Sequence, residues 1–510
     1  MARQIQPDPS PSLAQLATST PDTRDRYVDF LRAFSIAVVV IGHWLMAIVF
    51  FNEGRLTGAN ALEVIPGLWL LTWVLQVMPL FFFVGGFSNL TSIRSIRRRG
   101  GGSLLFIRNR AERLLRPTLV FVAAWMVIAI VLERVLGSGA ALQHGTALVA
   151  KPVWFLAVYL LVIALSPAML LLHERFRWFV PAGMALGAVT VDVVRIAFDL
   201  ELIGYLNFAF VWLFAHQLGF FYADGTLTRI SRRTFAAIAV ASLACLVALT
   251  NFSVYSRSMV GTASERVSNN DPPSVCIILL TLWLIALAML MRGRAGSWLS
   301  RPRNWAAVIA ANSVIMTVFL WHLTALLVAV VVAYPLGFPQ FEGGSAGWWL
   351  SRPIWLAVAA AALAPFVVAF ARFERPRFTL DAHRPRPVVP SAGATTVGIA
   401  LLVLGMGGFA QGGFAGALEP QGTNLGLFEA NPLLSAVHLA IGTALLRGAS
   451  RVTTAVASAG LVGLGMLEAF SPTSSLLTVI PVTGGNAVLH LLCGCALSVF
   501  GIDEIERRSR

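Results

Sequence analysis

The sequence predicts an all-α protein, a polytopic helical bundle with about ten membrane spans and a C-terminal bundle of about four further apolar helices. Its 510 residues are 57% hydrophobic and only 12% charged, with a mean hydropathy of +0.76. Apolar stretches long enough to cross a bilayer recur along the chain. Arginines are concentrated in the short segments between these stretches, a distribution typical of membrane proteins.

The chain begins with a polar arm, residues 1–26, which contains four prolines and which we expect to be disordered and cytoplasmic. The arm has no apolar core of its own, so we expect no cleavable signal and interpret the first span as an uncleaved anchor. The ten spans predicted for the main bundle are residues 28–51, 65–90, 117–136, 153–172, 179–198, 205–222, 234–251, 274–291, 305–334 and 353–371.

Loop charge predicts the orientation of these spans. With a cytoplasmic N-terminus, the inner loops within residues 91–386 hold 22 arginines, and the outer loops hold five lysines or arginines. The opposite orientation would invert the positive-inside rule at every crossing. The net charge of +14 therefore indicates topology rather than nucleic-acid binding, and we expect a multi-pass membrane protein with both termini cytoplasmic.

We assign the main bundle to residues 27–378. A basic, proline-containing stretch follows its last span. We interpret residues 379–393 as a cytoplasmic linker, because its prolines cannot continue a helix for long. A second membrane unit, residues 394–503, follows with apolar segments at 394–412, 431–446, 452–470 and 482–500, and residues 504–510 form a polar cytoplasmic tail.

Arg32 and His43 lie inside the first apolar stretch, and ionisable groups within a membrane span are costly and usually functional. Eleven positions correspond to about 1100° of rotation, so both side chains share one helix face about 16 Å apart. Asp29 lies near the same face, where an i,i+3 contact can hold Arg32. The alternative is structural: an arginine that snorkels to the interface and a histidine that bonds a neighbouring helix.

Other segments contribute further candidates. Arg110 and Arg113 suit a phosphate-bearing ligand, because guanidinium groups pair with phosphate oxygens, but a basic inner loop is also what topology requires. Trp154, Phe155 and Tyr159 either line a pocket or anchor the end of a span at the interface. His322, in the ninth span, is equally compatible with a cavity and with the packed core.

The remaining polar groups are expected to be structural. Asp192 and Arg195, three residues apart in the fifth span, are expected to neutralise each other. His438 and His490 each begin a similar motif that ends in glycine, which suggests either a repeated two-helix unit or, preferably, contacts between His and Asn on closely packed helices. The four cysteines have neither zinc nor thioredoxin spacing, so we expect no metal site and no disulfide framework.

Several of these motifs together resemble the membrane-bound acyltransferase 3 family, whose signature is an Arg and a His separated by ten residues. The run from Arg24 to Ala33, followed by Gly42-His43-Trp44, matches the opening of that family. Similar agreement extends to about residue 378, through Phe81 to Phe87; Arg110, Arg113 and Pro117; Trp154-Phe155-Leu156; Ser166-Pro167; Asn312-Ser313 to His322; and Phe373 to Pro376. The C-terminal unit, with its Asn-Leu-Gly and Val-His-Leu motifs, resembles a small actinobacterial membrane domain of unknown function, which implies that the membrane is a bacterial plasma membrane.

The resemblance implies transfer of an acyl group, with acetyl expected, from cytosolic acyl-coenzyme A to a hydroxyl of a cell-envelope carbohydrate or glycolipid at the membrane. Acyl-coenzyme A is then a co-substrate, with no bound cofactor. His43 suits a general base, worth on the order of 10²- to 10⁴-fold in rate, and Arg32 suits donor binding or oxyanion stabilisation. His322 and Asp29 support them, Arg110 and Arg113 bind the donor, and Trp154 and Phe155 line the pocket. Two other classes remain open: a transporter or exporter of an envelope metabolite, and a non-catalytic membrane scaffold.

Overall fold

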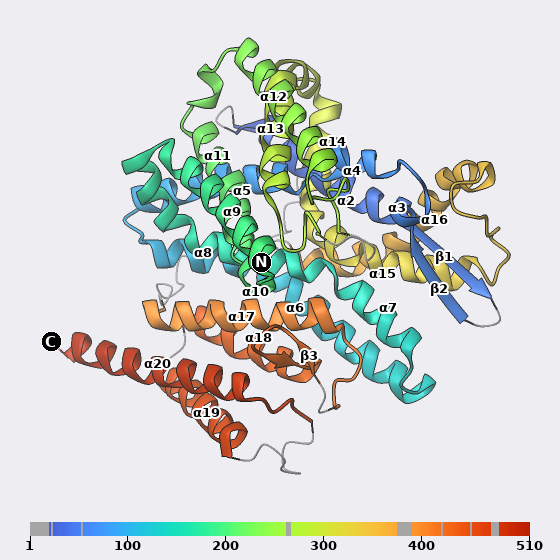
Figure 1. The fold of residues 1–510 in the computed structure, drawn as a ribbon. Coiled ribbons are helices and arrows are strands. Elements are labelled where there is room, and N and C mark those ends of the chain that lie inside the picture. The colour runs from blue at the N-terminus through green and yellow to red at the C-terminus, as the bar shows by residue number, and fades with distance from the viewer. Residues whose placement is uncertain are drawn as a thin grey trace, which may run out of the picture.

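The computed structural model describes residues 20–21, 24–52, 55–261, 267–374, 390–419, 422–448, 451–470 and 479–509. The protein is an all-α polytopic bundle, as the composition predicts (Figure 1). Within the described residues, twelve helical units are long and apolar enough to cross a membrane, and two further apolar helices are shorter. Most of the expected N-terminal arm and of the expected linker lies outside the described residues.

Ten of the twelve long units precede residue 375. They are α2 (Arg26–Met46), α4 with α5 (Trp69–Leu75 and Met78–Arg98), α6 (Ser103–Leu136), α7 with α8 (Ala140–Ala150 and Pro152–Phe176), α9 (Phe179–Phe198), α10 with α11 (Glu201–Gly204 and Asn207–Ala223), α12 (Arg232–Phe252), α13 (Val275–Leu299), α15 (Ile315–Ala333) and α16 (Ala346–Glu374). Shorter pieces connect them: α3 (Ala61–Val64), the 3₁₀ turn η1 (Leu227–Arg229) and α14 (Pro302–Ser313).

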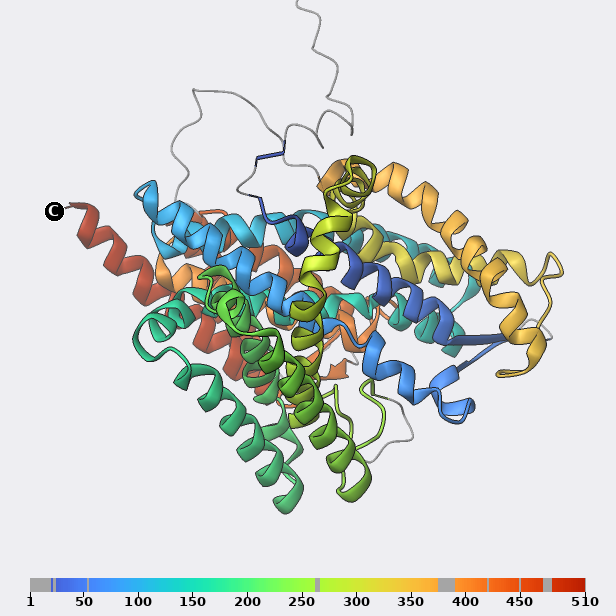
Figure 2. The same cartoon turned by 90° about the horizontal axis from the view of Figure 1, so that it is seen from above.

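The first predicted span is too long at its C-terminal end. Helix α2 ends at Met46, and Ala47–Asn52 forms strand β1, which pairs antiparallel with β2 (Arg55–Asn60). The run Ile-Val-Phe-Phe in β1 is β-branched and aromatic, a composition that favours strands. The hairpin projects from the end of the bundle where α2 ends (Figures 1 and 2).

The ninth predicted span is also divided. Its N-terminal part is α14, and the backbone leaves the helical region at Val314 before α15 begins. The carboxylate of Glu374, at the end of α16, accepts hydrogen bonds of 3.0 Å from the backbone N–H groups of Met316 and Thr317. These are among the first N–H groups of α15, which lack partners within their own helix. Glu374 therefore caps the helix that carries His322.

The C-terminal unit lies along one side of the bundle (Figure 1), packed on α8 and α7 through α17 (Ala392–Gly412) and on α6 through α18 (Pro432–Leu446). It continues with the short strands β3 (Thr423–Asn424) and β4 (Glu429–Ala430), then α18 (Pro432–Leu446), α19 (Arg451–Phe470) and α20 (Gly484–Ser509). Helices α17 and α18 approach so closely that a Cβ added at Gly442 would lie 2.6 Å from the Gly398 carbonyl oxygen. A side chain at Gly442 would not fit, which explains why the motif that begins at His438 ends in glycine.

Candidate active site

His43, the histidine of the predicted signature, lies next to His322 of the ninth predicted span. His43 Nδ1 and His322 Nε2 are 2.8 Å apart, and their rings stack with centroids 5.0 Å apart and an interplanar angle of 15°. His43 is exposed, whereas His322 is fully buried. The structure thus joins two candidates that are 279 positions apart in the chain.

The hydrogen bonds of this pair determine where its protons lie. His322 Nδ1 is 2.6 Å from the Phe319 carbonyl oxygen, which can only accept, so Nδ1 carries the proton. In a neutral His322 the Nε2 is then an acceptor, and it receives the bond from His43 Nδ1–H. In a neutral His43 this leaves Nε2 as a bare lone pair, and no described residue forms a hydrogen bond to it. An accessible nitrogen in this state is a base.

Two indole groups hold the backbone around this pair. Trp44 Nε1 donates to the His322 carbonyl at 2.9 Å, and Trp355 Nε1 donates to the Trp44 carbonyl at 3.1 Å. Both tryptophans are buried, so α2, α15 and α16 are tied together at the level of the histidines. A buried indole N–H usually finds such a partner.

Arg32 lies nearer the start of α2, in a network of its own. Its Nη1 donates to Asp29 Oδ1 at 3.0 Å, and its Nη2 donates to the hydroxyl of Ser88 on α5 at 2.8 Å. The second carboxylate oxygen of Asp29 accepts a 2.6 Å bond from Arg24 Nε. The Asn312 side chain of α14 donates to the Asp29 carbonyl at 2.9 Å. Asp29 is buried and bridges two guanidinium groups.

Arg110 and Arg113 occupy different environments on α6. Both Nε and Nη2 of Arg110 donate to Asn89 Oδ1, at 2.9 and 2.7 Å. Asn89 Nδ2 in turn bonds Ser166 Oγ and His216 Nε2, each at 3.1 Å. Arg113 is exposed. Arg110 therefore ends a buried polar network, and Arg113 faces outward from the same helix.

Aromatic side chains lie between the network of Arg32 and the network of Arg110. Phe155 stacks on Tyr159 with centroids 5.8 Å apart and meets Phe319 edge-on at 5.4 Å. Tyr159 is close enough to Arg32 and to Arg110 to interact electrostatically with both. It also lies over Gly85, where a Cβ would approach its ring to 2.9 Å. The aromatic surface thus runs from the arginines toward Phe319, one turn before His322.

Trp154 is peripheral to this surface. It is partly exposed and contacts Phe155 and Phe208, with centroids 6.2 Å apart in both pairs.

The prediction that Asp192 and Arg195 pair with each other is wrong. Arg195 donates to Glu201 at 3.1 Å, and Asp192 accepts instead from Asn207, Tyr255 and the Val275 N–H. A carboxylate with three donors needs no adjacent cation.

The C-terminal unit contains a second histidine pair. His438 Nε2 and His490 Nε2 are 2.8 Å apart, and His490 Nδ1 is 2.7 Å from Glu468 Oε2. The expected contact between histidine and asparagine is wrong: Asn431 caps α18, and Asn486 bonds the backbone of Glu429 and Pro481. Among the described residues, no group of three or more His, Cys, Asp or Glu side chains is arranged to hold a metal ion.

Several site residues were not singled out in the sequence. Ser88, Asn89 and His216 contact the candidates or the helices that carry them, and Glu374, which the sequence placed only within the stretch Phe373 to Pro376, caps α15. A polar residue in the middle of an apolar segment was the available signal for His216, because such a group needs partners in a membrane. Ser88 and Asn89 lie at the end of the predicted second span and Glu374 lies beyond the tenth, where polar residues are common and carry no comparable signal.

Comparison with known proteins agrees with this arrangement of the chain. Residues 25–372 match a family model described as an acyltransferase domain. Residues 392–502 match a model described as a domain of unknown function, DUF4383. No curated protein and no solved structure matches the chain.

Proposed function

Because the chain belongs to the membrane-bound acyltransferase 3 family, we propose that it transfers an acyl group, preferably acetyl, from cytosolic acyl-coenzyme A to a hydroxyl of a cell-envelope carbohydrate, glycolipid or similar acceptor. The observation that carries this proposal is the bare Nε2 of His43, exposed next to a buried partner that fixes its tautomer. A hydroxyl is a poor nucleophile at neutral pH, so a positioned base is what the transfer requires.

The transfer step uses this nitrogen twice. His43 Nε2 takes the proton of the acceptor hydroxyl while the hydroxyl oxygen attacks the carbonyl carbon of the thioester. The carbon–sulfur bond then breaks, the ester forms, and the proton on Nε2 passes to the departing thiolate. His322 stabilises the imidazolium formed in between, because its Nε2 accepts from His43 Nδ1–H throughout.

Arg32 suits the donor rather than the reacting carbonyl. It precedes His43 by about 16 Å of helix rise, and its guanidinium is directed to Asp29 and Ser88. We therefore assign Arg32 to the phosphate or pantetheine part of the donor, positioned by Asp29. Arg110 supports the same end of the site, and the exposed Arg113 suits contact with donor phosphates from the cytosol. Phe155 and Tyr159 suit the wall along which the acyl arm lies, with Trp154 at its edge.

The proposed orientation places both termini in the cytoplasm and His43 toward the outer face. His43 lies three residues before the end of α2, and Lys151, in an expected outer loop, is close enough to act on it electrostatically. The donor then enters from the cytosol and the acceptor from the opposite side. Cysteine labelling of position 43 from the cytosolic side alone would contradict this.

For residues 394–503 we propose a supporting role for the catalytic bundle, residues 27–378. Helix α17 packs along α8, which carries Phe155 and Tyr159. The Ala415 N–H also donates to Thr146 Oγ1, between the two units, at 3.2 Å. Deletion of residues 391–510 is expected to lower the thermal stability of the rest; unchanged stability and activity would refute the role.

The test is acyl-coenzyme A turnover by the purified protein in lipid nanodiscs, with a cell-envelope glycan and glycolipid extract as acceptor. Release of free thiol that depends on the acceptor separates an enzyme from a transporter or a scaffold. His43→Ala should abolish most of this turnover. The matched control is His144→Ala, an exposed histidine of α7 that bonds only its own helix, which should retain it. Equal turnover in both variants would contradict the proposal.

A further inference from the structure

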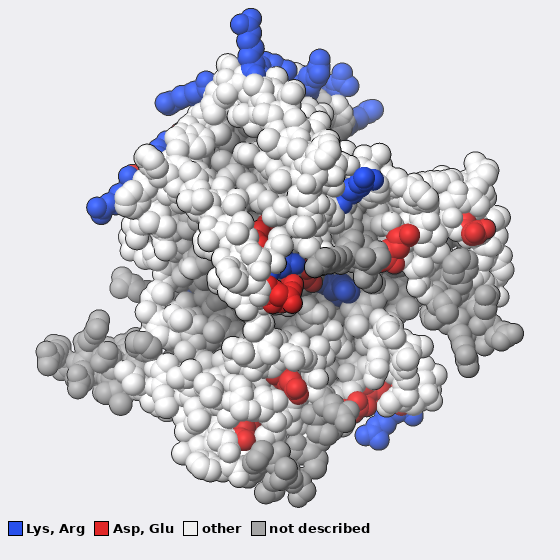
Figure 3. Space-filling model, in the orientation of Figure 1, with Lys and Arg blue, Asp and Glu red and all other residues white. Residues whose placement is uncertain are grey.

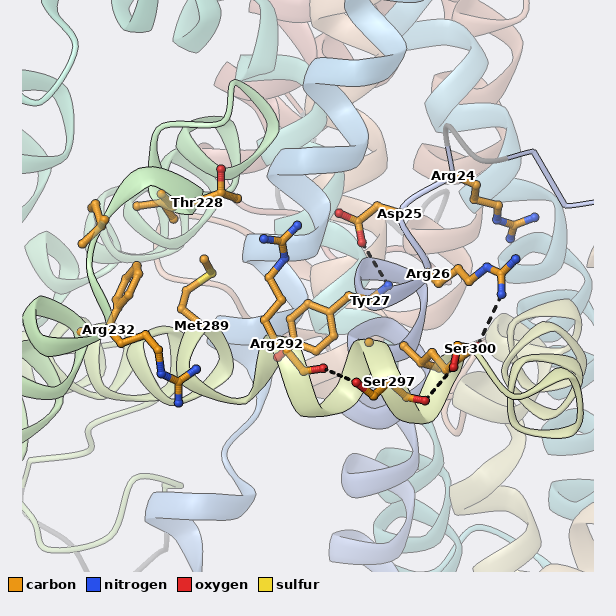
Figure 4. Close-up of a pocket in the computed structure, with 16 residues that line it drawn as sticks. Arg24, Asp25, Arg26, Tyr27, Thr228, Arg232, Met289, Arg292, Ser297 and Ser300 are labelled. Atoms are coloured by element: carbon orange, nitrogen blue, oxygen red, sulfur yellow. Dashed lines mark hydrogen bonds between the residues drawn. The ribbon is translucent and has the colours of Figure 1, made fainter.

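A basic pocket lies at the end of the bundle where α2 begins, apart from the histidine pair. Its volume is about 720 Å³, within the range of small-molecule sites. It is formed by the segment before α2, by the turn and first residues of α12, and by the end of α13. Figure 4 shows Arg232 on one side of the pocket and Arg24 and Arg26 on the other, with Arg292 between them. Lys and Arg side chains also gather along the edge of the molecular surface near α12 and α13, at the top of the view (Figure 3).

The positive charge of this pocket is poorly compensated. Four arginines line it, and Asp25 is the only carboxylate among the described residues of its lining. Asp25 is already engaged, because it caps α2 and accepts a 2.9 Å bond from the Tyr222 hydroxyl. Within the part of the chain that the structure describes, Arg26, Arg232 and Arg292 form no ion pair with a carboxylate. Arg26 and Arg232 donate to backbone carbonyls instead, at 3.5 and 2.9 Å.

Arg26 and Arg292 are held in place although they form no ion pair among the described residues. Arg292 lies over the Tyr222 ring at 5.5 Å, and Arg26 lies over the Trp305 ring at 5.3 Å. Such contacts restrain a guanidinium while leaving its edge free to donate. Gly296 of α13 also lines the pocket, and a Cβ added there would meet nothing within 4 Å. Restrained donors around open space suit an anion that carries several oxygens.

The pocket is connected to the signature arginine. Arg24 lines it, and its Nε is 2.6 Å from Asp29 Oδ2. The other oxygen of the same carboxylate holds Arg32 at 3.0 Å. A ligand bound by Arg24 is therefore two contacts away from Arg32, on the same helix as the reacting histidine.

We propose that this pocket binds a phosphate ester, and that the ester is the nucleotide end of the acyl donor. Coenzyme A carries a diphosphate and a further phosphate monoester at that end, with a long neutral arm leading to the thioester. Phosphates held by Arg26, Arg232 and Arg292 would leave this arm to run past Arg32 toward His43. The choice of donor rests on the proposed function, whereas an anionic lipid headgroup has the same phosphate chemistry and is the alternative source.

The experiment measures coenzyme A binding by calorimetry to the full-length protein in phosphatidylcholine nanodiscs. The Arg232→Gln/Arg292→Gln variant should bind at least about tenfold more weakly, because each lost guanidinium–phosphate contact is worth roughly a factor of ten. The matched control is Arg233→Gln/Arg294→Gln, which removes the same charge from adjacent exposed positions outside the pocket. The control should stay within about twofold of the unchanged protein.

A second variant fills the pocket without removing charge. Gly296→Phe places a ring where the structure has open space and should weaken binding as strongly, with unchanged thermal unfolding as the check on folding. In acyl transfer, both pocket variants should raise KM for the donor and leave kcat within about threefold. Phosphatidylglycerol retained on the purified protein is measured by native mass spectrometry in the same variants.

The outcomes separate the proposals. Weaker coenzyme A binding in both pocket variants, with a normal control, supports the donor assignment. Unchanged coenzyme A affinity with loss of bound phosphatidylglycerol keeps the phosphate site but overturns the donor as its source. If the unchanged protein turns over acyl-coenzyme A and the pocket variants alter neither binding nor KM nor bound lipid, the pocket proposal is overturned while the proposed function stands. If the unchanged protein binds no coenzyme A, the donor assignment is wrong. Loss of bound phosphatidylglycerol in the pocket variants then supports a phosphate site, and unchanged bound lipid overturns it.

Discussion

Each part of the chain contains a pair of histidines 2.8 Å apart inside the helical bundle, yet the two pairs differ in what surrounds them. In the pair His43–His322 one ring is buried and the other is exposed. In the pair His438–His490 both rings are buried, and a buried carboxylate, Glu468, bonds the second ring. The first pair leaves His43 Nε2 without a hydrogen-bond partner among the described residues. The second is closed on all sides by helices.

The difference teaches that burial, rather than the presence of histidine, distinguishes the pair that we propose to be reactive from the pair that we propose to be structural. A carboxylate in a membrane interior is costly unless it is paired. The imidazole of His490 supplies that partner for Glu468, which explains why α18, α19 and α20 each contribute one member of the cluster. The open pair needs no carboxylate, since the Phe319 carbonyl fixes its tautomer instead.

The largest expected effect tests the open pair. His43→Ala should lower kcat for acyl transfer by about 10²- to 10⁴-fold, the usual contribution of a general base, while His438→Ala should change kcat by less than about threefold. Turnover of acyl-coenzyme A by both purified variants, at equal folded concentration, makes the comparison. A similar loss in both would remove the distinction between the two pairs.

The buried member of the open pair should have a smaller effect. His322→Ala removes the acceptor that fixes the His43 tautomer and should reduce kcat by roughly 10- to 100-fold, the range for a lost buried hydrogen bond. His322→Gln should recover most of this loss, because its amide oxygen can accept from His43 Nδ1–H at the position of Nε2. A purely structural role predicts no such recovery, so equal rates for the two variants would contradict the positioning role.

In the closed pair the expected effect is on stability. Glu468→Gln replaces the carboxylate that accepts from His490 Nδ1, and we expect it to destabilise the protein by roughly 1–3 kcal/mol, the range for a weakened buried polar contact. Thermal unfolding in detergent measures this change. Acyl transfer per folded molecule should be unaltered, and a selective loss of kcat without loss of stability would instead give the closed pair a part in the reaction.

The sequence predicts much of this comparison but not its contacts. Hydropathy predicts the helical spans, and helical periodicity predicts the shared face of Arg32 and His43. The first span is confirmed as a helix over Arg26–Met46. The β1–β2 hairpin was missed because an apolar strand and an apolar helix end have the same hydropathy. The contacts of His43 with His322 and of Arg110 with Asn89 depend on how helices pack. Nothing within either segment specifies which distant helix lies opposite.

The smallest expected effect concerns access alone and requires no substitution. Diethyl pyrocarbonate acylates accessible, unprotonated imidazole nitrogens, so it should modify His43 at Nε2. His438 and His490 are 3% and 0% exposed and should react at least about tenfold more slowly in the folded protein. Mass spectrometry of peptides after brief labelling gives the rates, with the exposed His144 as the reference for an unhindered ring. If His43 reacts as slowly as the closed pair, its lone pair is not open to a substrate, and the base must be sought elsewhere along the aromatic surface.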